Sequence, residues 1–168
     1  MSILAIDPGP NQSAVLIYDP NADSPIVAHG ILDNDEVIRE MGSPWMAAKE
    51  MAVEMVASYG MAVGRDVFET VYWIGRFCQR WESFTAGVSN RVYRKDIKLF
   101  LCNSPRAKDA NVRQAIIDRF PATGGGRVPQ IGTKNQPGPL YGVKSHVWSA
   151  LAVALYFAEA RQPVKEAK

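Results

Sequence analysis

The first nine residues carry the feature that most restricts the fold of this chain. An apolar run at residues 3–6 (ILAI) leads directly into Asp7, Pro8 and Gly9. Consecutive apolar residues in a short segment favour a strand that is buried on both faces of a sheet, and Pro followed by Gly ends it. The sequence therefore predicts a buried strand with one carboxylate, Asp7, at its C-terminal end. Taken alone, such a residue more often starts a turn, so its role depends on the rest of the chain.

Two further apolar segments follow closely, at residues 13–18 and 25–32. The connections between the three segments are short and rich in Pro, Asn and Asp, which favours an antiparallel meander. We expect a short helix at residues 35–42. A fourth strand is expected at residues 52–56, where Glu54 interrupts an apolar run near the strand end.

The second half of the chain predicts helices and one more strand. The expected elements are a long amphipathic helix from Asp66 to Glu82 with Asp66 as its N-cap, a fifth strand at residues 91–102, a helix at 107–120 and a last helix at 145–161. Residues 121–141 contain many Gly and Pro and show no periodicity, which is typical of a long functional or disordered loop.

Size and composition favour one globular domain. The chain has 168 residues and 47% hydrophobic residues, enough for a core of normal size, and we expect a single domain over residues 1–163 with a polar tail at 164–168. No apolar run approaches the ~20 residues of a membrane helix, and no signal peptide is evident. Cys78 and Cys102 lack metal or redox spacing, which suggests buried thiols in a reducing cytoplasm.

Charge is unevenly distributed, although the net charge is only +2. Lys and Arg are concentrated in the middle third of the chain, whereas residues 19–54 are mostly acidic. A basic side suited to a phosphate backbone is one interpretation. A mixed, solvated surface explains the composition equally well.

The order of elements and the positions of the acids together indicate an α/β fold of the RNase H-like type. We expect a central five-stranded mixed sheet, with a three-strand antiparallel meander and two parallel strands, flanked by helices. In that arrangement the first and fourth strands are neighbours, so Asp7 and Glu54 converge. The last helix brings His146 over the same point, and Ser149 lies on the same helix face.

Four segments, in this order, resemble the motifs of RuvC-type Holliday junction resolvases, and more closely those of phage-encoded members. They are residues 3–9 (ILAIDPG), residues 53–54 (VE), residues 108–114 (KDANVRQ) and residues 146–155 (HVWSALAVAL). The resemblance implies a metal-dependent, structure-selective endonuclease that resolves four-way and other branched DNA by paired nicking. It also implies a homodimer in the cytoplasm of a bacterial or phage-infected cell.

The resemblance further implies a metal site made by Asp7, Glu54 and His146. Carboxylates suit Mg²⁺, for which Mn²⁺ can substitute, and two such ions are expected. Family members usually carry a second acid three residues after the histidine position, whereas this chain has Ser149. We expect Glu69 on the long helix to complete the catalytic set, with Asp109 as the next candidate.

DNA contacts are expected from Lys108, Arg113, Arg94 and Lys134. His29 has no acid beside it in the sequence and is interpreted as structural. The long helix carries a second apolar face at Phe68, Tyr72 and Gly75, which predicts a two-fold dimer interface, although core packing also accounts for an apolar stripe.

Three other functions remain open on the sequence alone. The first is an RNase H-like nuclease that acts on RNA. The second is a catalytically weak or silent protein that binds branched DNA, which the serine at position 149 permits. The third is a nucleotide-binding fold of the sugar-kinase type, ranked last because 168 residues leave no room for its two domains.

Overall fold

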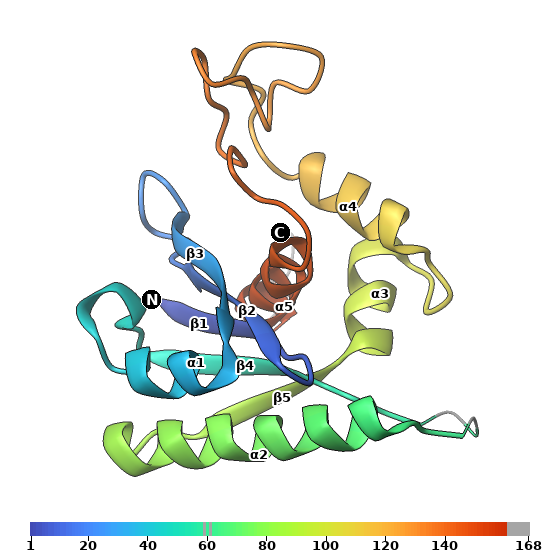
Figure 1. Ribbon diagram of the computed structural model, residues 1–168. Coiled ribbons are helices and arrows are strands. Elements are labelled where there is room, and N and C mark those ends of the chain that lie inside the picture. The colour runs from blue at the N-terminus through green and yellow to red at the C-terminus, as the bar shows by residue number, and fades with distance from the viewer. Residues whose placement is uncertain (59, 61, 161–168) are drawn as a thin grey trace, which may run out of the picture.

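The computed structural model describes residues 1–58, 60 and 62–160, and these residues are organised around a five-stranded sheet (Figure 1). The strands lie in the spatial order β3-β2-β1-β4-β5. Strand β2 is antiparallel to β1 and β3, whereas β4 is parallel to β1 and to β5. The mixed sheet expected from the sequence is therefore confirmed. The strands comprise β1 (Ile3–Asp7), β2 (Gln12–Tyr18), β3 (Ile26–Asp33), β4 (Glu50–Met55) and β5 (Ser89–Tyr93).

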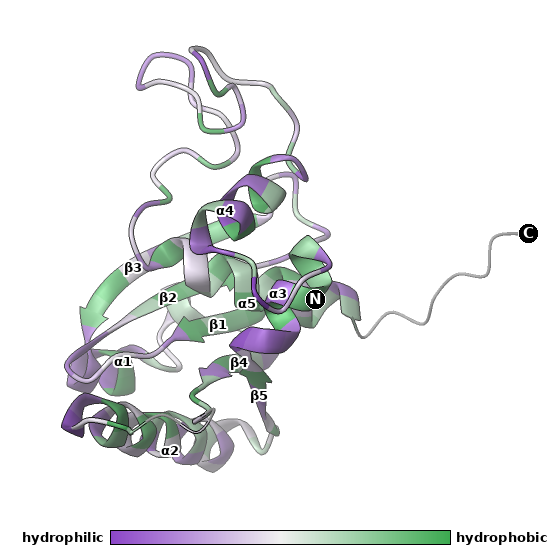
Figure 2. Cartoon of the chain, turned by 90° about the vertical axis from the view of Figure 1, so that its right-hand side faces the viewer, coloured by the Kyte–Doolittle hydropathy of each residue, from purple (hydrophilic) through white to green (hydrophobic). Residues whose placement is uncertain are grey.

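Helices cover both faces of this sheet (Figures 1 and 2). One face carries α1 (Asn34–Glu40) and the long α2 (Arg65–Thr85), and a 3-10 turn (Pro44–Met46) leads into β4. The other face carries α5 (Val147–Ala160), against which α3 (Arg94–Cys102) and α4 (Asp109–Ile117) pack.

Strand β1 lies at the centre and contributes to two cores. Successive side chains of a strand point to opposite faces, so Leu4 and Ile6 pack in the core under α1 and α2, whereas Ile3 and Ala5 pack in the core under α5. All four are fully buried. Burial of each large aliphatic side chain contributes roughly 1.5–3 kcal/mol. By the same alternation Asp7 belongs to the α5 face.

One predicted element is wrong in part. Residues 91–102 were expected to form a single strand, but the strand ends at Tyr93 and α3 follows directly. Ile97 and Leu101 are buried four residues apart, which is helical spacing. Asn103 ends the helix in the left-handed conformation with φ 54°, a conformation that Asn tolerates better than most residues. The packing of α3 against α5 outweighs the strand propensity of residues 94–102.

Other helix boundaries differ by a few residues from those expected. Helix α2 begins at Arg65 with Gly64 as its N-cap, so Asp66 lies in its first turn and is not the cap. Helix α4 is shorter than the expected 107–120. Helix α5 begins at Val147 because Ser145 has a φ of 48°, which is not helical. The expected end at residue 161 and the tail at 164–168 lie outside the described residues.

The segment at residues 121–141 contains no helix or strand, as predicted, yet it has a dense network of backbone hydrogen bonds. Gly132, with φ +77°, pairs with Pro137 across an isolated bridge. A Cβ at Gly132 would lie 2.2 Å from the amide nitrogen of Gly138, so only glycine fits this position. The segment stands above the sheet between α4 and α5 (Figure 1).

Two smaller expectations concern the cysteines and the membrane. Cys78 and Cys102 are free. The sequence predicted that both are buried, whereas both are half-buried. None of the helices in the described part of the chain has the length and apolar character that a membrane crossing demands.

Candidate active site

The sheet brings Asp7 and Glu54 together at one edge. In the parallel pair β1 and β4, Ile6 lies opposite Val53, so the next residues, Asp7 and Glu54, occupy equivalent positions and face the same side. Each carboxylate is only 15% exposed. The convergence that the sequence predicted for two residues 47 positions apart is therefore present in the fold.

Burial changes the protonation of both acids. Desolvation raises the pKa of Glu54 from 4.5 to about 7, against the opposing effect of the nearby Arg94 charge, and the negative charge of Asp7 raises it further. Desolvation also raises the pKa of Asp7, whereas His146 lowers it. Two desolvated carboxylates that repel one another are typical of a site that binds a cation.

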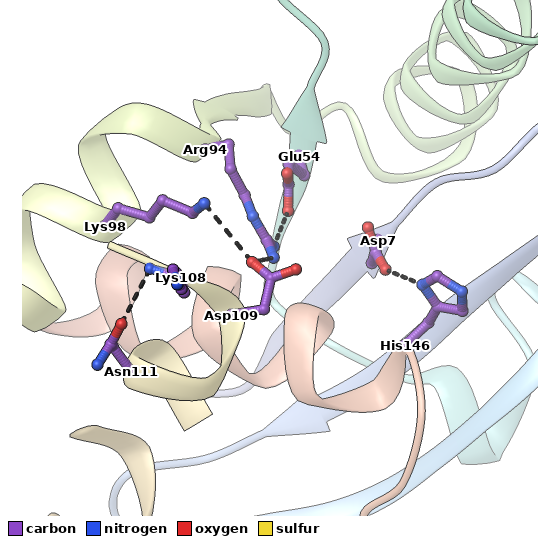
Figure 3. Close-up of polar contacts among 8 residues, drawn as sticks. All are labelled: Asp7, Glu54, Arg94, Lys98, Lys108, Asp109, Asn111 and His146. Carbon is purple, nitrogen blue, oxygen red and sulfur yellow. Dashed lines mark hydrogen bonds and ion pairs between the residues drawn. The ribbon is translucent and has the colours of Figure 1, made fainter. Parts of the chain in front are cut away.

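His146 stands beside Asp7 just before α5. Its Nδ1 atom lies 3.2 Å from Asp7 Oδ2, and the side chain is 73% exposed (Figure 3). Ser149, one turn further on, also favours the charged form of Asp7 through a side-chain hydrogen bond. The position that usually holds a second acid in the resembling family thus holds a hydroxyl that contacts the first acid.

Arg94 lies within the acid cluster. Its Nη1 donates to Glu54 Oε2 at 3.1 Å, and its Nη2 donates to Asp109 Oδ1 at 2.8 Å (Figure 3). Lys98 Nζ lies 3.5 Å from the same Asp109 oxygen. Arg94 was predicted to contact DNA, and the structure places it between two carboxylates at the candidate site. The contact with DNA stays a prediction.

A sequence signal for this placement exists. Val92 lies opposite Glu54 in the parallel pair of β4 and β5, and Arg94 follows two residues later. Because side chains alternate along a strand, Arg94 continues on the face of Glu54 beyond the end of β5. The signal was hidden because the strand was expected to continue to residue 102.

Of the two acids considered for completing the site, Glu69 lies away from it, whereas Asp109 lies beside it and is bound to basic residues. Glu69 forms an i,i+4 ion pair with Arg65, at 3.6 Å, on the outer part of α2. Asp109 is bound to Arg94 and Lys98. The acid of α2 that shares a cavity with Asp7 and His146 is Asp66, in a space of about 690 Å³. The sequence predicted a capping role for Asp66.

A second cavity of about 740 Å³ lies between α4 and α5 and adjoins His146. Arg94, Arg113 and Lys144 line it, and the Arg113 guanidinium lies 4.8 Å from the centre of the Trp148 ring. Lys144 was not singled out from the sequence.

The other residues predicted to bind DNA are exposed. Lys108 precedes α4, and its backbone N–H donates to Asn111 Oδ1 at 3.0 Å (Figure 3). Lys134 is exposed in the segment above the sheet and lines neither cavity.

The donor types suit one hard divalent ion. Asp7, Glu54 and His146 offer carboxylate oxygens and an imidazole nitrogen, which Mg²⁺ and Mn²⁺ accept, and Asp7 already contacts His146. In the described part of the chain, no three such side chains are gathered closely enough to form a metal cluster. Glu54 is directed to Arg94, so ion binding requires this carboxylate to turn or to share its oxygens. Among the described residues, the only further acids that line the cavity of Asp7 and His146 are Asp33 and Asp66.

Comparison with known proteins was made on sequence and on structure. No protein-family model matches the chain, and a search of curated proteins returned no match. Solved structures do match: Thermus thermophilus RuvC has a TM-score of 0.63 at 13% identity, covering 95% of this chain and 97% of that one. The chain has the RuvC fold. A second structure, T. thermophilus RuvC in complex with Holliday junction substrate, has a TM-score of 0.63 at 16% identity and covers 94% of this chain and 93% of RuvC.

The similarity to RuvC extends over nearly the whole of both chains. At this level of identity the comparison establishes the fold alone. The role of each side chain depends on the geometry described above.

Proposed function

We propose that this protein is a metal-dependent endonuclease that resolves Holliday junctions and other branched DNA. The observation that carries the proposal is that adjacent strand ends of a RuvC fold place Asp7 beside Glu54, and that His146 contacts Asp7. A RuvC of the same fold has been solved with a Holliday junction substrate. The domain expected over residues 1–163 is then a single nuclease domain, acting in our proposal on DNA in the cytoplasm of a bacterial or phage-infected cell.

The reaction is hydrolysis of a phosphodiester bond. A water oxygen bonds to phosphorus while the bond from phosphorus to the 3′ oxygen breaks, leaving a 5′-phosphate and a 3′-hydroxyl. A bound Mg²⁺ or Mn²⁺ would lower the pKa of water and stabilise the leaving oxygen. Asp7, Glu54 and His146 would hold the ion, and the contact between Asp7 and His146 fixes the orientation of the imidazole.

Basic residues beside the site account for DNA binding. Arg113 and Lys144 line the cavity next to His146, and Lys108 is exposed at the start of α4. Lys134 extends this basic surface onto the segment above the sheet. Such side chains contact phosphates and add affinity without sequence preference.

A homodimer would supply two active sites for two strands. Phe68 and Tyr72 are 64% and 58% exposed on the outer face of α2. Tyr72 and Gly75 line a shallow groove of about 650 Å³ there. Exposed aromatic residues on one helix face are suited to a two-fold interface. Sedimentation of the wild type and of Tyr72→Glu tests this: we expect a dimer for the wild type and a monomer for the variant.

The function is tested with labelled substrates. Four-way junction, linear duplex and RNA/DNA hybrid are each incubated with Mg²⁺, Mn²⁺ or EDTA, and Asp7→Asn serves as the matched inactive variant. We expect symmetric nicks in the junction only, dependent on metal and absent in Asp7→Asn. Cleavage of the hybrid would favour an RNA-directed nuclease, and junction binding without cleavage would favour a binding protein.

A further inference from the structure

Arg94 is the described cation most firmly fixed at the candidate site. Its guanidinium is held by Glu54 from β4 and by Asp109 from α4, at 3.1 and 2.8 Å, and its side chain is 27% exposed. Arg94 also lines the cavity that contains His146 and Ser149. A guanidinium has five N–H donors, so two carboxylate contacts leave donors for a further anion in that cavity.

The charges at this point do not match a site for two divalent ions. Asp7 and Glu54 supply two negative charges, Ser149 supplies none, and Arg94 contributes a positive charge in direct contact with Glu54. One divalent ion offsets the two acids. A second ion beside Arg94 would face both the first ion and the guanidinium. Glu69 and Asp109 are engaged in ion pairs, and Asp66 lines the cavity of Asp7 but not the cavity that Arg94 lines.

We propose that Arg94 is a catalytic residue that takes the place of a second cation, in a site that binds one divalent ion per protomer. The proposal rests on the nuclease function above. The Arg94 guanidinium donates hydrogen bonds to a non-bridging oxygen of the scissile phosphate and stabilises the charge that develops as the water oxygen bonds and the 3′ oxygen leaves. The guanidinium keeps its proton throughout; the attacking water releases a proton to solvent, and the leaving 3′ oxygen takes one from solvent. Fixed donors directed at developing charge are among the strongest catalytic devices.

Asp109 has a positioning role in this arrangement. It binds Arg94 and Lys98 through one oxygen, which connects the start of α4 to α3. An arginine held at two points loses little freedom when it contacts phosphate, because its position is already determined. Asp109→Asn keeps the size of the side chain while weakening that restraint.

The test compares Arg94→Gln and Arg94→Lys with Arg119→Gln, a control in which another ion-paired arginine, bound to Glu159, is changed. Single-turnover cleavage of a four-way junction is measured for each protein. Mn²⁺ binding is measured by calorimetry without DNA at pH 8.5, where Glu54 is ionised. Junction affinity is measured in the Asp7→Asn background.

We expect Arg94→Gln to slow cleavage by roughly 10²- to 10³-fold, as loss of a fixed donor to developing charge does elsewhere. Arg94→Lys should recover part of the rate, because it keeps the charge but not the planar fork. Mn²⁺ affinity should rise by roughly three- to tenfold in Arg94→Gln, since a like charge beside the ion is removed. Wild-type protein should bind one Mn²⁺ per protomer, and Arg119→Gln should match it throughout.

Several results would overturn the proposal. Two Mn²⁺ ions per wild-type protomer, or cleavage by Arg94→Gln within threefold of the wild-type rate, would reduce Arg94 to a counter-ion of Glu54. If Arg94→Gln does not fold, Arg94→Lys decides, because an unchanged rate in that variant rejects a geometric role. Wild-type protein that cuts no nucleic acid rejects the nuclease function itself, an outcome distinct from a nuclease that does not need Arg94.

Discussion

Replacing Glu54 with Gln should stabilise the metal-free protein at alkaline pH. The pKa of Glu54 lies at about 7 in the folded state and at 4.5 ordinarily, so the folded protein holds more protons than the unfolded chain between these pH values. Stability therefore falls as pH rises through this window. At ~1.4 kcal/mol for each pH unit that separates the two values, the ionised carboxylate costs about 3 kcal/mol at pH 8. Glutamine keeps the shape and can still accept the Arg94 hydrogen bond, but it carries no charge.

The assay is thermal unfolding in EDTA at pH 8 and pH 5. We expect Glu54→Gln to melt about 6–12 °C higher than wild type at pH 8, because a chain of this size shifts by ~2–4 °C per kcal/mol. At pH 5 the cost of ionisation falls below about 1 kcal/mol, so the difference should nearly vanish. Glu69→Gln is the matched control, since the Glu69 carboxylate pairs with Arg65 near the surface, and its melting point should change little at either pH.

Metal should reverse the order of stability. Mn²⁺ at ~1,000 times its dissociation constant stabilises the protein that binds it by about 4.1 kcal/mol, which exceeds the ionisation cost of about 3 kcal/mol and applies to wild type and not to Glu54→Gln. An equal or lower melting point for Glu54→Gln at pH 8 without metal would refute the reasoning, because it would mean that Arg94 compensates the buried charge completely. A higher melting point of Glu54→Gln that persists at pH 5 would also refute the reasoning, since the difference would then not come from ionisation of Glu54.

Three further predictions concern the rest of the site. Cleavage should fall by roughly 100-fold in His146→Ala but remain within tenfold of wild type in His146→Asp, because a carboxylate restores a metal ligand. Single-turnover rates check this, and equal activity of both variants would make the imidazole dispensable. Lys108→Ala and Arg113→Ala should each lower the slope of log affinity against log salt by about one for any branched DNA, as loss of one phosphate contact does; a change in sequence preference at constant affinity would instead indicate base contacts. Ser149→Asp should raise the number of Mn²⁺ ions bound per protomer or lower the Mn²⁺ concentration needed for cleavage. Calorimetry measures the first and a Mn²⁺ titration of cleavage the second, and no change in either would mean that this position does not face the ion.

Much of the fold was accessible from the sequence because local signals agreed with the final packing. The run at residues 3–6 is buried on both faces as its composition indicates, and the short polar connections determine the meander. The acid at the end of β1 and the acid near the end of β4 then meet because parallel neighbours end at the same edge. These inferences needed only strand periodicity and the order of elements.

The parts that failed depend on distances that a sequence does not contain. Glu69 and Asp66 lie three residues apart on one helix, and only the angle at which α2 crosses the sheet directs Asp66 to the cavity and leaves Glu69 with Arg65. The segment at residues 121–141 has no periodic pattern because its order comes from backbone contacts between glycines. Its composition resembles that of a disordered loop, and only packing distinguishes the two.

The error at β5 also hid the position of Arg94 beside the acids. A strand continued to residue 102 would place Arg94 inside the strand, eight residues before its end. Ending the strand at Tyr93 puts Arg94 at the C-terminal edge of the sheet, next to the strand ends that carry Asp7 and Glu54. At such an edge of parallel strands, catalytic and binding groups collect. The boundary between strand and helix therefore brings this arginine to the acids, and the Arg94 variants test whether its predicted contact with DNA is made to the scissile phosphate.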